Sequence, residues 1–263
     1  MPDSSDSTRP HPKNAAAPDP IARADAASRA QRLMRVAGKP VVSAARAVKR
    51  HALPHYTLGE EIANSVTHGV GAALAIAALV IMIVKAAADG AHPAALASAI
   101  VFGATLIFEY LASTLYHAIP PKAVKRVFRV IDHSGIYVLI AGSYTPFCLV
   151  TLGEHGGIPL CATVWALAAA GVAFEVIMRE RQPRWLTVTI YLVMGWLVVF
   201  RLPQLISLLD PVALALLAAG GLCYTVGTVF YLLKKIRYMH SVFHVWVLAG
   251  SVLQFLAVIL FVI

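Results

Sequence analysis

The feature of this sequence that most limits its fold is a series of long apolar runs, separated by short breaks of charged residues, proline or glycine. A helix needs about 20 residues to cross a hydrocarbon layer about 30 Å thick. Seven runs reach that length, and they predict membrane-spanning helices at residues 66–88, 94–117, 133–152, 158–178, 185–203, 211–233 and 241–262. No segment shows the two-residue alternation of a strand. We therefore expect an all-α membrane protein, a seven-transmembrane helix bundle.

The composition agrees with this expectation. Hydrophobic residues make up 59% of the chain and charged residues 13%, whereas soluble domains average about 45–50% and about 25%. So little charge cannot cover the surface of a soluble protein of this size. The three cysteines lie in apolar runs without metal-ligand spacing, so they indicate neither a disulfide framework nor a zinc ribbon.

Residues 1–55 differ from the rest of the chain. They contain ten Lys or Arg, several prolines and no sustained apolar periodicity, which is typical of a disordered tail. As an alternative, residues 29–50 interleave basic and apolar side chains and could lie on an anionic membrane surface. The domain organisation we expect is a basic tail at residues 1–55, followed by one transmembrane domain at residues 56–263.

The net charge of +9 follows the topology of the predicted spans. Twenty of the 22 basic residues fall in the tail or in the loops after the second, fourth and sixth spans. By the positive-inside bias, these segments are cytoplasmic, with the N-terminus inside and the C-terminus outside. The charge is then a topological signal, and we do not expect a nucleic-acid partner.

Most polar residues of the spans gather at the predicted cytoplasmic ends. They are Glu61, Asn64, Thr67 and His68 in the first span region, Ser113 and His117 in the second, Asp132 before the third, and His240 and His244 in the seventh. Ionisable groups within a membrane are costly and therefore mark candidate functional sites. In addition, Thr57 and Glu60 have the spacing of a capping box at the start of the first helix.

The histidines have the pattern of a metal site. His240 and His244 are four residues apart and project from one helix face, and His117 and Asp132 belong at the same depth. Three imidazoles, with a carboxylate acting directly or through water, suit tetrahedral zinc with one position left for water. The alternative is a set of interfacial polar residues paired with neighbours or water.

Other polar residues have two interpretations each. Ser113 could bond to a metal-bound water or to a carbonyl of its own helix. Glu61, Asn64, Thr67 and His68 could orient the metal ligands or join helices by hydrogen bonds. Glu109, eight residues before His117, could relay protons or be a protonated, hydrogen-bonded side chain.

Four segments, at residues 61–68, 112–117, 132–146 and 240–244, resemble in sequence and order the signatures of the hemolysin III family. That family is the bacterial branch of the progestin and adiponectin receptor proteins, in a superfamily that includes alkaline ceramidases. The resemblance covers about residues 56–263. It implies zinc bound by His117, His240 and His244, with Asp132 contacting the metal-bound water and Ser113 in the same site. Glu109 and the basic tail fall outside the pattern.

The function expected from these observations is hydrolysis of a lipid amide or ester by zinc-activated water at the cytoplasmic side, with Asp132 and Ser113 as catalytic residues. The resemblance indicates a bacterial inner membrane, with membrane lipids and a lipid substrate as partners. A second hypothesis is a non-enzymatic protein with structural zinc that acts in membrane homeostasis or as a receptor. The family name also suggests pore formation, but no span has a continuous polar face.

Overall fold

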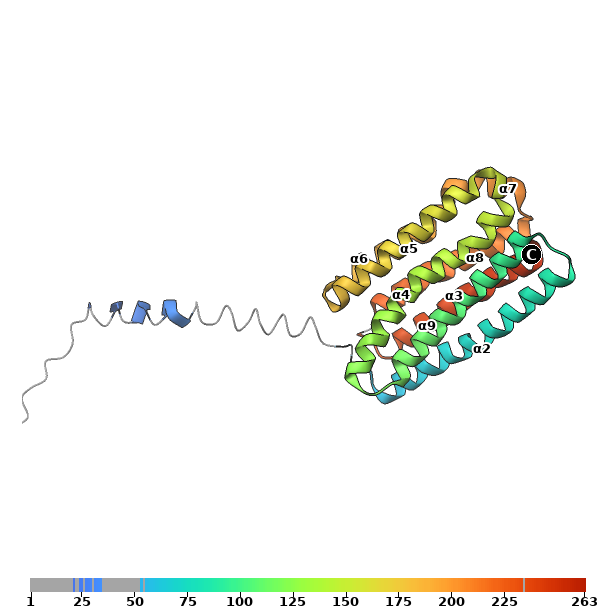
Figure 1. Cartoon of the computed structure of the whole chain (residues 1–263). Helices are drawn as coiled ribbons and strands as arrows, with labels where there is room; N and C mark the ends of the chain where they lie inside the picture. The colour runs from blue at the N-terminus through green and yellow to red at the C-terminus, as the bar shows by residue number, and fades with distance from the viewer. Residues whose placement is uncertain are drawn as a thin grey trace, which may run out of the picture. The chain divides into compact units, whose positions relative to one another are not determined.

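In the computed structural model of the chain (Figure 1), the described residues are 21, 24, 25, 27–29, 31–34, 53, 55–233 and 235–263. The chain separates into two compact units, Met1–Ala52 and Leu53–Ile263. The described residues of the first unit are helical. The predictions of a disordered tail and of a membrane-surface segment fall mostly on residues of that unit that lie outside the described ones.

The described part of the second unit is helical with short connections and contains no strand. Its elements are α2 (Leu58–Ala88), α3 (Pro93–Ala118), α4 (Lys122–Pro146), the π-helical η1 (Phe147–Thr151) and η2 (Gly153–Gly157), α5 (Ile158–Met178), the 3-10 helix η3 (Arg179–Arg181), α6 (Arg184–Trp196), the 3-10 helix η4 (Leu197–Arg201), α7 (Leu202–Leu208), α8 (Pro211–Leu232) and α9 (Met239–Phe261).

Within the described residues, seven continuous helical stretches are long and apolar enough to cross a membrane, which confirms the seven-helix prediction. Four of their ends lie five or more residues from the predicted ones. The first stretch begins at Leu58, the third at Lys122 and the fourth at Gly153, because each helix continues through a polar or glycine-containing turn that hydropathy does not count. The fifth runs to Leu208, since Pro203 occupies the first turn of α7, where proline is tolerated.

The helices that carry the predicted site residues pack against one another. Helix α3 contacts α2 and α4, and α9 contacts α2 and α8 (Figure 1). Helix α4 is the most buried of the seven stretches. The ends at which α2, α4 and α9 begin and α3 finishes are called the histidine end below.

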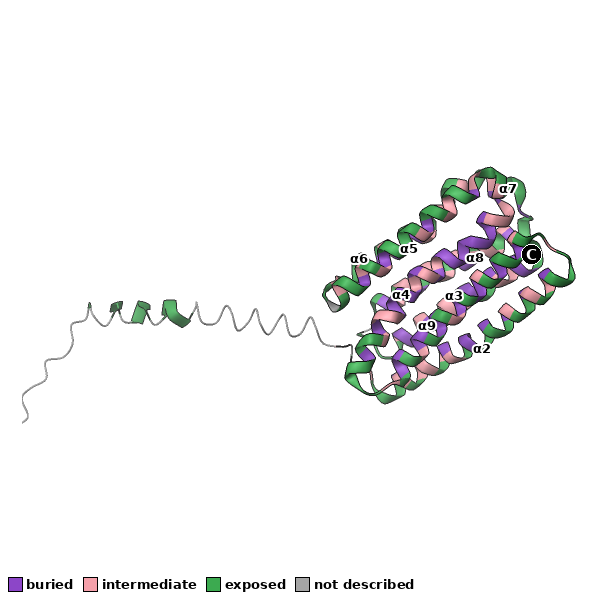
Figure 2. Cartoon of the chain, viewed as in Figure 1, coloured by how far each residue is buried: buried purple, intermediate pink, exposed green. Residues whose placement is uncertain are grey.

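The burial pattern is that of a bundle surrounded by lipid. Buried residues concentrate where helices face one another, and the outer faces are exposed (Figure 2). Many exposed side chains are large and apolar, among them Ile81, Phe200, Val229 and Leu260. Apolar surface of this extent is stable in a hydrocarbon layer and not in water.

Glycines allow close helix packing at two places near the site. A Cβ at Gly71 on α2 would lie 2.8 Å from Cδ1 of Tyr110 on α3. A Cβ at Gly135 on α4 would collide with Oε2 of Glu109 on α3. Small residues at such contacts are typical of membrane helix interfaces, and here they bring α2, α3 and α4 together around the histidine end.

Candidate metal centre

The start of α2 fixes the start of α9. Thr57 and Glu60 form the predicted capping box, in which each side chain bonds the backbone N–H of the other. The second carboxylate oxygen of Glu60 accepts the backbone N–H of Tyr238 at 3.1 Å. Tyr238 caps α9 in the left-handed region, with φ of 62°. One acidic side chain therefore joins α2 to the turn that leads into His240.

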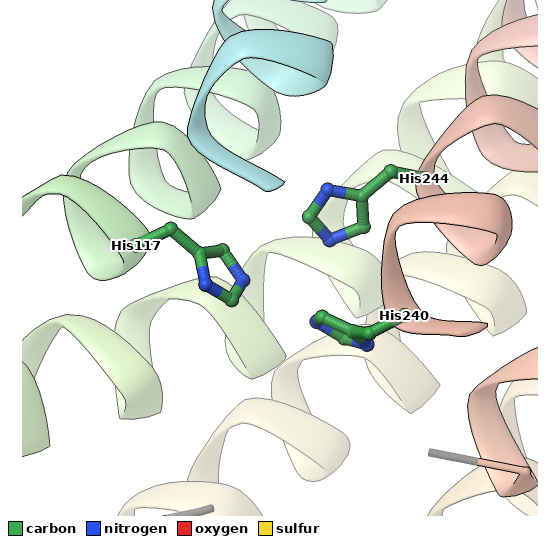
Figure 3. Close-up of side chains that lie close together, drawn as sticks. All are labelled: His117, His240 and His244. Carbon is green, nitrogen blue, oxygen red and sulfur yellow. The ribbon is translucent and has the colours of Figure 1, made fainter. Parts of the chain in front are cut away.

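Three buried histidines meet at the histidine end (Figure 3). His117 lies in the last turn of α3, while His240 and His244 lie on successive turns at the start of α9. One nitrogen from each ring can be chosen so that all three lie within 4.8 Å of one another. The ring centroids of His240 and His244 are 4.6 Å apart, and each is 5.2–5.3 Å from that of His117.

The ring of His117 is oriented by an acidic residue of α2. Its Nδ1 lies 2.7 Å from Oε2 of Glu61, and Lys125 Nζ lies 2.8 Å from the other oxygen of that carboxylate. The Nε2 of His117 is buried and has no hydrogen-bond partner within the described residues. With Nδ1–H donated to Glu61, Nε2 keeps its lone pair for a metal.

The ring of His244 is held in the same way by the next turns of α2. Its Nδ1 lies 3.2 Å from the backbone oxygen of Asn64 and 3.2 Å from Oγ1 of Thr67. The Asn64 side chain also accepts a hydrogen bond of 2.5 Å from Ser241 Oγ, and its amide nitrogen lies 3.4 Å from Nδ1 of His117. Asn64 thus contacts both α3 and α9.

This donor set fits a metal ion. Three imidazoles are typical ligands of zinc and of several other transition metals. A ligating histidine commonly donates its second N–H to a carboxylate or a backbone carbonyl, as His117 and His244 can do here. The buried Nε2 of His117, which has no hydrogen-bond partner in the described part of the chain, is the atom that would bind a metal. The cluster could therefore hold a metal ion.

His68 supports the cluster by stacking. Its ring lies 3.6 Å from that of His244 between centroids, at an interplanar angle of 13°. Neither of its nitrogens has a hydrogen-bond partner within the described chain.

Four residues were expected to orient the metal ligands. Glu61, Asn64 and Thr67 approach a ligand nitrogen within hydrogen-bond distance, and His68 touches a ligand ring. Their role in metal binding stays a prediction.

Asp132 and Ser113 are buried near the cluster without belonging to it. The group of atoms that could share a metal contains the three histidines and no carboxylate. Asp132 lies on α4 and is 6% exposed. Ser113 lies one turn before His117, and its Oγ has no hydrogen-bond partner among the described residues. Contact of Asp132 with a metal through water, and the catalytic roles of both residues, stay predictions.

Tyr56 covers the cluster, a role that the sequence did not indicate. Its ring stacks on that of His240, with centroids 5.2 Å apart and an angle of 18°, and meets the edge of His117 at 5.6 Å. Burial raises the pKa of the Tyr56 phenol well above its usual value, so the phenol stays neutral. An aromatic residue just before a capping box has no spacing that would distinguish it from an interfacial anchor.

A cavity of about 330 Å³ adjoins the cluster. Most of its wall is aliphatic or aromatic, from α4, α6, α8 and α9. Phe243 and Tyr231 line it and also contact the histidines, since their rings lie 5.6 Å and 6.0 Å from that of His240. His68 and Glu109 add polar groups to this wall. The volume of the cavity and its mainly apolar wall suit a hydrocarbon chain.

Most of the chain is similar in sequence to haemolysin III-related proteins. A family model described as Haemolysin-III related matches residues 56–255. A "Hemolysin-3 homolog" of Bacillus subtilis (strain 168) is 43% identical over 206 residues, which cover 78% of this chain and 96% of that protein. "Hemolysin-3" of Bacillus cereus is 41% identical over 203 residues, covering 77% and 92%. A more distant relative, the human "Monocyte to macrophage differentiation factor", is 28% identical over 170 residues, covering 60% and 67%.

Proposed function

The chain belongs to the haemolysin III-related family, and from its multi-pass architecture and histidine cluster we propose that it is a zinc-dependent membrane hydrolase of a lipid amide or ester. The observation that carries the proposal is the orientation of the histidines. Partners on α2 occupy the Nδ1 atoms of His117 and His244, so the opposite nitrogens can bind one ion. Membership of the family does not by itself establish that the Nδ1 atoms of His117 and His244 have these partners on α2.

Zinc is the ion that this donor set favours, since the histidines are neutral nitrogen ligands and leave a fourth position open. His117, His240 and His244 would hold it. When bound, zinc lowers the pKa of a water molecule toward ~7 and polarises a carbonyl oxygen. The carboxylate–histidine contact of Glu61 with His117 would raise the basicity of that ligand and fix its ring.

The neighbouring residues would move the protons. A carboxylate oxygen of Asp132 would accept the proton of the attacking water and return it to the leaving amine or alcohol. Oγ of Ser113 would donate a hydrogen bond to the carbonyl oxygen as negative charge develops there. Both side chains are buried at the histidine end, where few water molecules would compete for these bonds.

The apolar cavity supports a lipid as the substrate. Phe243 lines the cavity and contacts the rings of His240 and His244, and the cavity wall consists mainly of hydrocarbon side chains. An acyl chain lying in it would present its carbonyl to the cluster. The positive-inside bias places the histidine end at the cytoplasmic face, so the substrate would come from that leaflet of a bacterial inner membrane.

The test is turnover by the purified full chain, loaded with zinc, on a panel of ceramides, other acyl amides and acyl esters. We expect release of a free fatty acid, and we expect Asp132→Asn to abolish it while zinc stays bound. Zinc-loaded protein that cleaves no member of the panel would contradict the proposal. If zinc is only structural, alanine at His240 or His244 lowers thermal stability and function in parallel, and Asp132→Asn has no specific effect.

A further inference from the structure

Glu109 is a buried acidic residue that the proposed reaction does not use. It lies on α3, two turns before His117, is 2% exposed and lines the apolar cavity. Its Oε2 has no hydrogen-bond partner within the described residues. A carboxyl group in an apolar wall costs free energy unless a polar partner reaches it. No described residue supplies that partner to Oε2, so it would come from water or from the ligand of the cavity.

Gly135 fixes the position of the Glu109 carboxyl relative to Asp132. Oε2 of Glu109 fills the space that a side chain at Gly135 would need. Gly135 lies three residues after Asp132, on the same face of α4, and three residues advance a helix by about 4.5 Å. The carboxyl is therefore about one helical turn from Asp132, on the side of the cavity.

A lipid whose carbonyl is attacked beside Asp132 has to extend its acyl chain past Glu109 to enter the cavity. Counted from the carbonyl carbon, the second and third carbons lie one and two bonds of ~1.5 Å away, and a hydroxyl on either of them spans the rest of the distance with a hydrogen bond of about 2.7 Å. We propose that Glu109 is a specificity-determining residue that accepts a hydrogen bond from a hydroxyl on the second or third carbon of the acyl chain. The preferred ligands are then 2- or 3-hydroxyacyl lipids.

This inference rests on the proposed function, because that function places the acyl carbonyl at the histidine end. It does not depend on the charge of Glu109, since a carboxyl oxygen accepts a hydrogen bond in either protonation state. A chain without the hydroxyl would leave the buried carboxyl unpaired. The loss of one such bond corresponds to about tenfold in affinity.

Binding of the product acids tests the inference without requiring turnover. The zinc-loaded full chain is titrated with hexadecanoic acid, 3-hydroxyhexadecanoic acid and 12-hydroxyhexadecanoic acid by displacement of a radiolabelled fatty acid. We expect the 3-hydroxy acid to bind about tenfold more tightly than hexadecanoic acid. The 12-hydroxy isomer should show no such gain, because its hydroxyl lies beyond the reach of Glu109.

Three variants assign the preference to the carboxyl. Glu109→Leu should abolish it and still bind hexadecanoic acid, which shows that the cavity is folded. Glu109→Gln should keep part of it, because the amide oxygen also accepts. The matched control is Ser98→Ala on the same helix: Ser98 is buried, has an unpartnered Oγ within the described chain and lies outside the cavity, so its loss should leave the preference unchanged.

The outcomes separate the two proposals. Equal binding of the three acids, a preference that survives Glu109→Leu, or no binding of any acid overturns the inference about Glu109. Hydrolysis of plain and 3-hydroxyacyl substrates at equal rates also overturns it, while the proposed hydrolase stands. A hydroxyl preference that Glu109→Leu removes, in a protein that cleaves no lipid, supports the binding role and contradicts the hydrolase.

Discussion

The Nδ1 atom of His117 lies 2.7 Å from Oε2 of Glu61, so a carboxylate at the start of α2 orients the histidine that ends α3. The same carboxylate bonds Lys125 at the start of α4. This pair of contacts joins three helices at the point where a metal would bind.

Replacing Glu61 should weaken metal binding. Glu61→Gln removes the charge that raises the basicity of His117, and losses of this kind lower metal affinity about 10- to 100-fold. Competition with a zinc chelator measures the change. Glu154→Gln is the control, because Glu154 is exposed on η2. Equal zinc affinity in the Glu61 and Glu154 variants would show that Glu61 only pairs with Lys125.

Removing the polar side chain of Asn64 should destabilise the bundle. Asn64→Leu leaves Ser241 Oγ without its 2.5 Å bond, and an unpaired buried group costs about 1–3 kcal/mol. Thermal unfolding in detergent measures the loss. In a double-mutant cycle, the cost should shrink when Ser241→Ala has already removed the partner. Additive losses would mean that the two side chains are not coupled.

A side chain at Gly135 should displace Glu109. Gly135→Ala places a methyl group against Oε2 of Glu109, and overpacking of this kind costs about 1–3 kcal/mol. The melting temperature should fall, and Glu109→Ala should suppress the fall. Gly195→Ala is the control, because a Cβ there meets nothing within 4 Å. If Gly195→Ala lowers the melting temperature as much as Gly135→Ala, the collision is not the cause.

Tyr56 should slow the exchange of metal at the cluster. Its ring stacks on His240, and an aromatic pair contributes about 0.5–1.5 kcal/mol, so Tyr56→Ala should speed extraction of the metal by a chelator about two- to tenfold. Tyr56→Phe keeps the ring and should extract at the wild-type rate. An equal acceleration in both variants would assign the effect to the hydroxyl instead.

The sequence predicted the architecture well because membrane spans have a simple cause. Within a membrane, a single segment of about 20 apolar residues can form all of its own backbone hydrogen bonds only as a helix. The seven runs are also long and clearly separated. Helix ends were predicted less well. Hydropathy stops at the polar turn around Glu60 and Asn64, whereas the capping box starts the helix at Leu58.

The part of the candidate site that spacing and membrane depth can indicate was predicted from the sequence. Spacing identifies residues of one helix face, such as His240 and His244, and a shared depth adds His117, so the three histidines that meet were all found. Contacts that depend on the approach of two helices have no such signal. The placement of Glu109 against Gly135 and the stacking of Tyr56 on His240 depend on such packing between separate segments.

The most direct test of a metal centre is the metal content of the purified protein. Elemental analysis of the wild type should find about one zinc per chain, and the His240→Ala/His244→Ala double variant should contain almost none. The control is His92→Ala/His155→Ala, which removes two exposed histidines outside the cluster. Zinc retained by the cluster variant at the wild-type level would contradict the assignment of the site.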